Sequence, residues 1–280
     1  MKILVTGAGG FSGQHLIAYL STDVTVEIYS TSATSKREIG WLVCDLTQKK
    51  AVSDLIRQVM PDQIYHLAGT NSGDYDSDYR VNVLSTRNLL EAINEMQRRC
   101  RVLLVGSSAE YGFVSEEDNP VKEDHALAPM SVYGLTKVYQ TYLMQFYHCF
   151  YNVDLVMARP FNLLGRGAPG NLFVGRVYEQ IEALQAGRIT KIVVGKLENR
   201  RDYISIEEAV RYYALIMQRG KSGEIYNVGS GTSIPIRELL KRILEENGLS
   251  MAIVEERNAE LPHKFDIKDL VADIGKLKTL

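Results

Sequence analysis

The chain has 280 residues, of which 45% are apolar and 24% are charged, and these proportions are ordinary for a globular protein that buries a substantial core. The formal net charge of −2 gives no global attraction to nucleic acid or to an anionic membrane. The first apolar run, Ile3–Val5, is too short for a signal-peptide core, and no stretch approaches the ~20 apolar residues of a membrane helix. Cys44, Cys100 and Cys149 lie far apart without metal-ligand spacing, so we expect a cytoplasmic protein with no metal site.

Short β-rich runs alternate with helical patterns in the first half of the chain. Strands are predicted at Ile3–Thr6, Val24–Tyr29, Trp41–Cys44, Ile64–Leu67, Val102–Val105 and Val153–Ala158. Helices are predicted between them at Phe11–Leu20, Ala51–Val59, Val81–Met96 and Val132–Phe150. This alternation is typical of an α/β protein with a Rossmann-type doubly wound parallel sheet, which binds its ligands beyond the carboxyl ends of the strands.

The alternation becomes less regular after Pro160. Further helices are predicted at Val174–Ala186, Ile206–Met217 and Ile236–Asn247, and further strands at Ile192–Val194, Ile225–Val228 and Ala252–Val254. We therefore expect an NAD(P)-binding domain over residues 1–160 and a smaller substrate-binding portion over 161–280. The two are interleaved if strands from 191–194 and 205–228 return to the sheet.

A glycine-rich loop joins the first predicted strand to the first predicted helix. Gly7, Gly10 and Gly13 allow a tight turn there, and the helix N-terminus offers unpaired N–H groups to a pyrophosphate. A glycine-rich turn without a ligand is the alternative. The position between strand and helix favours a dinucleotide site, in which Phe11 and Ser12 also take part.

The end of the second predicted strand bears on the choice of cofactor. An NAD site usually places a carboxylate there, roughly 20 residues after the glycines. Here Thr31 and Ser32 occupy the strand end, Lys36 and Arg37 follow, and the nearest acid, Glu27, lies within the strand. Hydroxyls and nearby cations suit a 2′-phosphate, so NADP(H) is favoured over NAD(H), although the two cations could also be solvated loop charges.

Tyr133 and Lys137 are four residues apart near the start of a predicted helix, so they share one helix face. Reduction of a ketone requires a proton as well as a hydride, and a tyrosine beside a lysine can supply that proton. We expect the lysine ammonium to lower the pKa of the tyrosine. Ser107 ends a predicted strand and could donate to the carbonyl oxygen, as could Ser108; a polar turn is the alternative for both.

These motifs resemble the extended short-chain dehydrogenase/reductase superfamily over nearly the whole chain. The resemblance implies that Ser107, Tyr133 and Lys137 are catalytic, with Ser108 near the substrate and Tyr133 and Lys137 also touching the cofactor. It implies further cofactor contacts in three short segments, at Asp45, Leu46, Leu67, Ala68, Gly69 and Asn82.

One position separates the reactions of this superfamily. The sugar-nucleotide 4,6-dehydratases carry a glutamate two residues after the catalytic serine or threonine, where it removes a proton from C5. That position is Ala109 here, and alanine cannot transfer a proton. A dehydratase is therefore excluded unless the next residue, Glu110, takes that role, and we expect Glu110 to point elsewhere.

The second half of the chain resembles the GDP-mannose 4,6-dehydratase and GDP-4-keto-6-deoxymannose reductase branch of the superfamily. The resemblance implies substrate contacts at Asn162, Val174, Arg176, Arg201, Arg257 and Glu260. Arginines suit a pyrophosphate because bidentate contacts match its oxygens. The implied reaction is the NADPH-dependent reduction of a 4-keto nucleotide sugar, GDP-4-keto-6-deoxy-D-mannose to GDP-D-rhamnose. In this branch a Gly-Trp-Lys-Pro segment is expected beyond the position of Leu280.

Two other functions remain open. A nucleotide-sugar 4-epimerase acting on a UDP- or GDP-sugar would use the same three residues but keep its NAD bound, and a catalytically idle NADP-binding protein would use none of them. The helix predicted from Val132 carries more aromatic residues than one buried face needs, namely Tyr139, Tyr142, Phe146, Tyr147, Phe150 and Tyr151. The superfamily often pairs this helix with the one at Val81–Met96 across a dimer interface, so a homodimer is expected.

Overall fold

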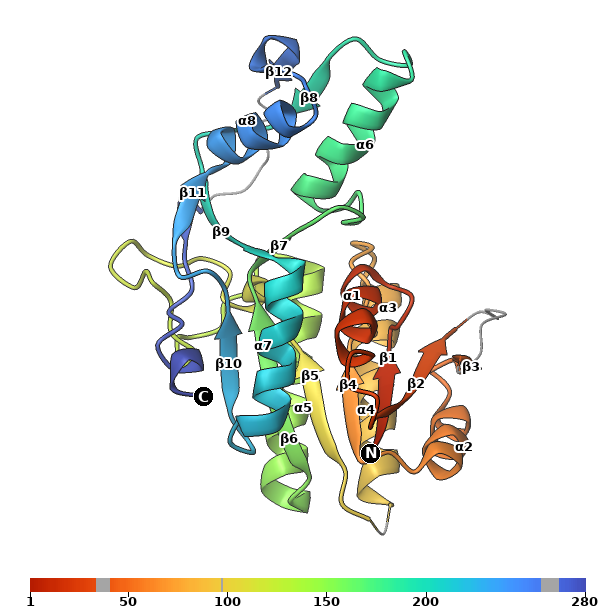
Figure 1. Ribbon diagram of the computed structural model, residues 1–280. Coiled ribbons are helices and arrows are strands. Elements are labelled where there is room, and N and C mark those ends of the chain that lie inside the picture. The colour runs from red at the N-terminus through yellow and green to blue at the C-terminus, as the bar shows by residue number, and fades with distance from the viewer. Residues whose placement is uncertain (34–40, 97, 258–266) are drawn as a thin grey trace.

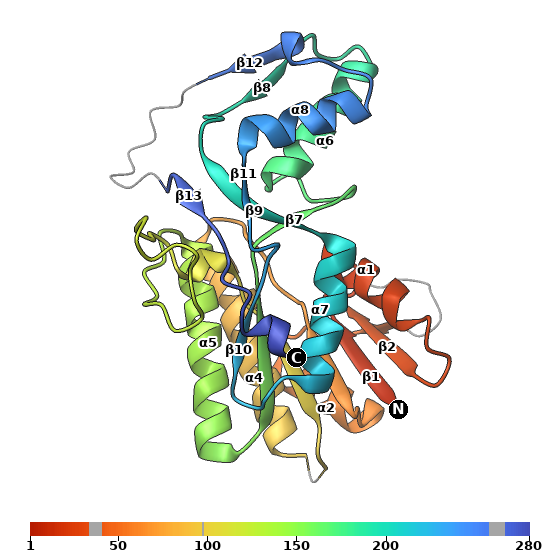
Figure 2. The ribbon, with the colours of Figure 1, turned by 60° about the vertical axis from the view of Figure 1, so that its left-hand side comes forward.

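The computed structural model describes residues 1–33, 41–96, 98–257 and 267–280. A layered lower part contains the main sheet, and an upper lobe stands above it (Figures 1 and 2). The main sheet has seven parallel strands in the order β10-β6-β5-β4-β1-β2-β3. The strands are β1 (Lys2–Thr6), β2 (Glu27–Ser32), β3 (Trp41–Val43), β4 (Gln63–His66), β5 (Arg101–Val105), β6 (Asp154–Pro160) and β10 (Ile225–Val228).

Helices cover both faces of this sheet because successive strand residues point to opposite sides. Ile3 and Val5 of β1 pack in the cluster that contains α1 and α7, whereas Leu4 between them packs with the helices of the other face. The first face carries α1 (Phe11–Leu20) and α7 (Ile206–Arg219). The second carries α2 (Lys49–Val59), α4 (Ser85–Asn94) and α5 (Val132–Tyr151). The predicted doubly wound α/β fold is confirmed.

The strand order reverses between β1 and β4, and the connections from these two strands leave in opposite directions. A doubly wound sheet binds its ligands at this point, beyond the carboxyl ends of the strands. The glycine loop follows β1 directly, so it stands at the reversal.

The segment after β4 differs from the single helix predicted at Val81–Met96. It contains a short α3 (Tyr75–Asp78), a π-helical segment (Tyr79–Leu84) and then α4. Side chains account for part of this irregularity, since the Ser85 hydroxyl bonds to the carbonyl of Val81 and Thr86 Oγ1 donates to the carbonyl of Asn82 at 2.6 Å.

The upper lobe has a hydrophobic core of its own, built from α6 (Phe173–Gln185), α8 (Ile236–Glu246) and β8 (Ile192–Val194). β8 pairs with β12 (Val254–Glu256). A four-stranded sheet joins this lobe to the lower part (Figure 2). It consists of β7 (Asn162–Leu164), β9 (Arg200–Ser205), β11 (Ser233–Pro235) and β13 (Asp269–Leu270). Short 3₁₀ turns lie at Ser108–Glu110, Met251–Ile253 and Leu277–Thr279.

Of the two strands considered for a return to the main sheet, Ile225–Val228 is in it as β10, beside β6. Ile192–Val194 is not; it pairs with β12 in the upper lobe, where its apolar side chains pack against α6 and α8. The linking strands β7, β9, β11 and β13 were not predicted. None of the helices in the described part of the chain is long and apolar enough to cross a membrane.

Candidate active site

A cavity of about 720 Å³ lies beyond the carboxyl ends of β1, β4, β5 and β6. The main sheet supplies its floor, the upper lobe supplies residues from the loop before α6, and the linking sheet supplies residues from β9. Lys137 and Arg201 are its charged lining residues in the described ranges 1–33, 41–96, 98–257 and 267–280, and no aspartate or glutamate lines it there. A cavity with this charge suits an anionic ligand.

The glycine loop forms one end of the cavity, where Gly7, Gly10, Phe11, Ser12 and Gly13 all line it. Gly7 has a φ of +67°, and a Cβ there would lie 2.6 Å from the backbone nitrogen of Ala68. A Cβ on Gly13 would lie 2.4 Å from the carbonyl oxygen of Gly7. Both positions therefore require glycine, and the N-terminus of α1 remains open to a phosphate group.

The predicted adenosine contacts lie apart from the cavity lining. Thr31 and Ser32 end β2, and Asp45 and Leu46 follow β3. The Asp45 carboxylate accepts hydrogen bonds from Thr47 N (2.9 Å) and Thr47 Oγ1 (2.7 Å), which lower its pKa. This is the geometry of a turn before α2. Lys36 and Arg37 lie outside the described residues.

The loop after β4 is held by Asn82, for which the resemblance implied a contact with the cofactor. Asn82 Oδ1 accepts from Thr70 N at 2.8 Å, and Asn82 Nδ2 donates to the Thr70 carbonyl at 2.9 Å. Leu67 and Gly69 of this loop line the cavity, whereas Ala68 donates its N–H to Thr6 Oγ1 at 3.4 Å. Asn82 is fully buried, so it fixes the loop from behind.

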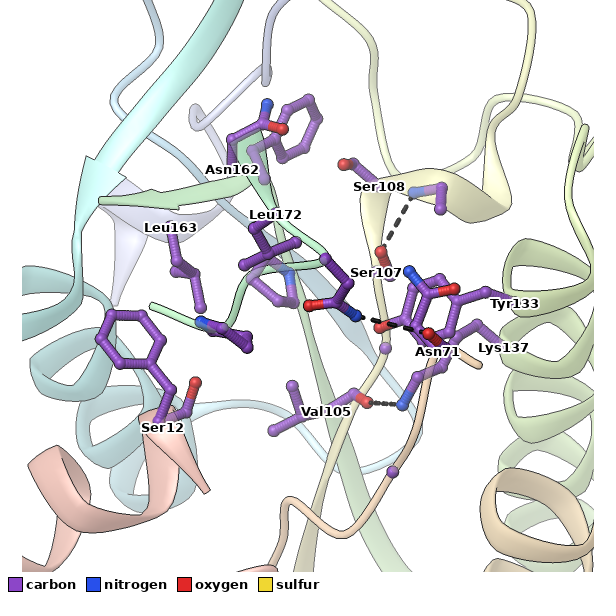
Figure 3. Close-up of a pocket in the computed structure, with 18 of the residues that line it drawn as sticks. Ser12, Asn71, Val105, Ser107, Ser108, Tyr133, Lys137, Asn162, Leu163 and Leu172 are labelled. Carbon is purple, nitrogen blue, oxygen red and sulfur yellow. Dashed lines mark hydrogen bonds between the residues drawn. The ribbon is translucent and has the colours of Figure 1, made fainter. Parts of the chain in front are cut away.

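Ser107, Tyr133 and Lys137 come together on one wall of the cavity (Figure 3). Ser107 follows β5, whereas Tyr133 and Lys137 lie in the first two turns of α5, whose N-cap Ser131 accepts from Gly134 N at 3.0 Å. Lys137 Nζ lies 5.7 Å from the centroid of the Tyr133 ring. Ser107 Oγ accepts from Ala109 N at 3.2 Å, which leaves its own hydrogen for another acceptor.

The pKa values on this wall differ from the sequence-based expectation. Burial raises the pKa of Tyr133 to about 12, and a hydrogen bond with the Ser107 side chain opposes that effect. Burial also lowers the pKa of Lys137 to about 8, against the Glu110 carboxylate, which raises it. The pKa of Tyr133 is therefore raised and not lowered as expected, because burial outweighs the opposing contributions. Tyr133 is a protonated acid at neutral pH.

Glu110 points away from the cavity, as expected. Its side chain is fully buried, and its Oε2 atom accepts from Arg159 Nη2 at 2.8 Å and from Thr141 Oγ1 at 2.6 Å. Its other oxygen accepts from the backbone nitrogen of Ser107 at 2.8 Å. The carboxylate thus fixes the turn that presents Ser107. Ala109, at the position where a dehydratase carries its acid, lines the cavity instead.

The predicted substrate residues separate into two groups. Ser108, Asn162, Val174 and Arg201 line the cavity. Arg176 and Arg257 are exposed and lie outside the described cavity lining; Arg257 Nε donates to Glu255 Oε1 at 2.7 Å. Glu260 lies outside the described residues.

Several lining residues were missed by sequence reasoning. Thr70 and Asn71 follow the carboxyl end of the strand predicted at Ile64–Leu67, and this position could have identified them as candidates for ligand binding. Asn71 and Asn171 both line the cavity, and Asn171 Nδ2 donates to the carbonyl oxygen of Asn71 at 3.4 Å. Met130 and Tyr213 also line the cavity, and nothing in the local sequence singles them out.

The chain is similar to known nucleotide-sugar proteins along most of its length. A GDP-6-deoxy-D-mannose reductase of Pseudomonas aeruginosa is 27% identical over 261 residues, which cover 91% of this chain and 83% of the relative. A GDP-6-deoxy-D-talose 4-dehydrogenase of Aggregatibacter actinomycetemcomitans is 27% identical over 282 residues, which cover 99% of this chain and 90% of the relative.

A solved structure shares the fold. The structure of RMD from Pseudomonas aeruginosa complexed with NADPH superposes with a TM-score of 0.84 at 24% identity, covering 100% of this chain and 92% of the other. Residues 3–229 match the model of the NAD dependent epimerase/dehydratase family, and this region includes the glycine loop, Ser107, Tyr133, Lys137 and Arg201. The chain therefore belongs to the NAD dependent epimerase/dehydratase family and is a nicotinamide-dependent oxidoreductase.

Proposed function

We propose that the protein reduces the 4-keto group of a nucleotide-activated 6-deoxy sugar, with GDP-4-keto-6-deoxy-D-mannose as substrate and GDP-D-rhamnose as product. The observation that carries this proposal is the absence of a carboxylate from the described cavity lining, with Ala109 at the dehydratase position and Glu110 buried against Arg159. A ketone reduction needs a proton donor and no carboxylate base. The names and coverage of the two relatives support a GDP-linked substrate.

The residues of the wall then have distinct roles. The bound nicotinamide supplies the hydride. Ser107 donates its hydroxyl hydrogen to the substrate carbonyl oxygen, and Tyr133 transfers a proton to the same oxygen as negative charge develops there. Lys137 adds positive charge beside the phenol.

The end of β2 favours NADPH as the cofactor. β2 ends in the hydroxyl residues Thr31 and Ser32, and the acid of this strand, Glu27, lies at its start. There Glu27 Oε1 accepts from the Tyr29 hydroxyl at 2.5 Å, so the carboxylate is engaged away from the strand end. A hydroxyl-lined strand end leaves room for a 2′-phosphate, where a carboxylate would repel it.

Substrate binding is proposed to involve residues of the cavity lining together with residues at a nucleotide end. Arg201 is the lining cation proposed to pair with the diphosphate, and Asn162 and Val174, which also line the cavity, are proposed as further substrate contacts. Arg176, Arg257 and Glu260 stay predictions for the nucleotide end.

A homodimer is proposed from the outer face of α5. Tyr142, Phe146, Phe150 and Tyr151 are exposed there, and an apolar face of this kind suits a second copy of the chain.

Consumption of the cofactor tests the proposed reaction. Incubation with GDP-4-keto-6-deoxy-D-mannose and NADPH should oxidise one NADPH for each sugar reduced, with a preference over NADH. Turnover of a nucleotide sugar without net change in NADPH absorbance would instead support the 4-epimerase. Affinities for GDP, UDP and dTDP measured side by side test the base, and a preference for UDP or dTDP would overturn the GDP assignment.

A further inference from the structure

Gln140 is a fully buried glutamine three residues beyond Lys137 on α5. Its amide is paired at both ends. Its Oε1 atom accepts from Lys137 Nζ at 3.1 Å, and its Nε2 atom donates to Thr86 Oγ1 at 2.9 Å. A buried amide is costly without partners, so a pairing of this kind determines where the side chain lies.

Thr86 decides which end of the amide faces the lysine. Its hydroxyl hydrogen is donated to the carbonyl oxygen of Asn82 at 2.6 Å, so Thr86 Oγ1 has only lone pairs left. Any further neighbour must therefore donate to it. Gln140 satisfies this with its NH₂ group, and its carbonyl oxygen is thereby turned toward Lys137.

His66 completes the same arrangement from the main sheet. Its Nε2 atom lies 3.0 Å from Thr86 Oγ1, and its Nδ1 atom lies 2.8 Å from Thr6 Oγ1. Burial lowers the pKa of His66 to about 3, so the ring is neutral and carries one N–H. That hydrogen must be on Nε2, because Thr86 can only accept there, and Thr6 donates to Nδ1.

Two of the three N–H groups of the Lys137 ammonium are consequently committed. One donates to the carbonyl oxygen of Val105 at 2.8 Å and one to Gln140 Oε1 at 3.1 Å. The third is left for the cavity, whose wall Lys137 shares with Tyr133 (Figure 3). We propose that Gln140 is a positioning residue for the reaction, one that sets the rotation of the Lys137 ammonium so that a single N–H faces the cavity.

A neutral acceptor is suited to this role because the charges around Lys137 are already balanced. The Glu110 carboxylate raises the pKa of Lys137, the neighbouring His66 is neutral, and the Tyr133 phenol is protonated at neutral pH. The Asp78 carboxylate, on α3, raises the pKa of Tyr133. Glutamine orients the ammonium without a further negative charge, whereas glutamate would hold it as an ion pair.

Two substitutions at Gln140 should move the titration of Lys137 in opposite directions. Gln140→Glu adds a carboxylate and should raise the titration midpoint by about one pH unit or more. Gln140→Met keeps the length of the side chain but removes the acceptor of the charged form, so the midpoint should fall by about half a pH unit or more. Thr86→Val, which frees the amide to rotate, should move it in the same direction as Gln140→Met and by less.

The measurement is an NMR titration of the full-length protein with ¹³C-labelled lysine, in which Lys137→Met identifies the resonance. Met144→Leu, a volume-conserving change in the buried core one turn further along α5, is the matched control and should titrate like the wild type. Thermal melting confirms that each variant is folded. If folded Gln140→Glu and Gln140→Met titrate at the wild-type pH, or shift in the same direction, the proposal is overturned.

The role in turnover rests on the proposed reduction, but the titration does not need substrate. The alkaline limb of kcat/KM for NADPH oxidation with GDP-4-keto-6-deoxy-D-mannose should shift in the same direction as the titration in each variant. A shifted titration with no NADPH oxidation in the wild type would retain Gln140 as the positioning residue and overturn the proposed function alone.

Discussion

The two walls of the cavity differ in how their polar side chains are held. On the wall of Ser107, Tyr133 and Lys137, the supporting residues Glu110, Gln140 and Asn82 are fully buried and hydrogen-bonded. On the side of the upper lobe, the lining residue Arg201 is only half-buried, and the predicted substrate residues Arg176 and Arg257 are exposed outside the described lining. In the proposed reaction, the chemistry depends on a wall whose supporting side chains are buried, while substrate recognition depends on side chains nearer to solvent.

The largest expected effect is at the proton donor. Tyr133→Phe removes the acidic hydroxyl and leaves the ring, so NADPH oxidation should fall by about 10²–10⁴-fold. NADPH binding, measured by fluorescence titration, should be unchanged. Turnover near the wild-type rate would contradict the assignment of Tyr133.

The support beneath Ser107 should also contribute strongly to stability. Glu110→Ala leaves Arg159 buried without its carboxylate and should lower the free energy of unfolding by about 3–5 kcal/mol in a urea titration. Lys50→Ala, which removes an exposed pair with Asp54, is the control and should leave the unfolding midpoint unchanged. Equal stability of the two variants would show that the Glu110–Arg159 pair contributes no more to the free energy of unfolding than an exposed pair does.

Adding one methyl group to the glycine loop tests how tightly the backbone is packed at this end of the cavity. Gly13→Ala places a Cβ 2.4 Å from the Gly7 carbonyl oxygen, so the loop must shift and NADPH should bind at least about tenfold more weakly. Gly195→Ala meets no atom within 4 Å and should leave the Kd unchanged. Unaltered NADPH binding by Gly13→Ala would place the cofactor elsewhere.

A smaller effect is expected on the side of the upper lobe. Arg201→Ala should raise the KM for the GDP-sugar about tenfold and leave kcat nearly unchanged, because a charged contact to the diphosphate contributes to binding alone. Steady-state kinetics over a range of substrate concentrations separate the two constants. A loss confined to kcat would argue that Arg201 acts on the chemistry.

The sequence was most informative where a local pattern sets a local structure. The β-strand and helix alternation predicted the parallel sheet, because apolar runs and helical periodicity depend on near neighbours. The four-residue spacing of Tyr133 and Lys137 likewise placed both on one helix face. Ser107 was singled out by its place at a strand end, and its catalytic role was implied by the resemblance.

What the sequence missed depends on contacts between distant segments. Strands β7, β9, β11 and β13 are two to six residues long and pair with partners from far along the chain, so no local period marks them. The high pKa of Tyr133 results from burial, which the lysine spacing does not reveal. Gln140 is an ordinary helix residue in the sequence, and only the fold brings Thr86 and His66 to it.

The central claim is that this cavity reduces a ketone without a carboxylate base. The most direct test is to run the reaction in D₂O with GDP-4-keto-6-deoxy-D-mannose and with NADPH deuterated at the transferred position, beside an enzyme-free control for spontaneous exchange. The account predicts a product with one deuterium at C4, derived from NADPH, and no enzyme-dependent solvent deuterium at C5. Enzyme-dependent deuterium at C5 would show that a base removes that proton, and would contradict the account.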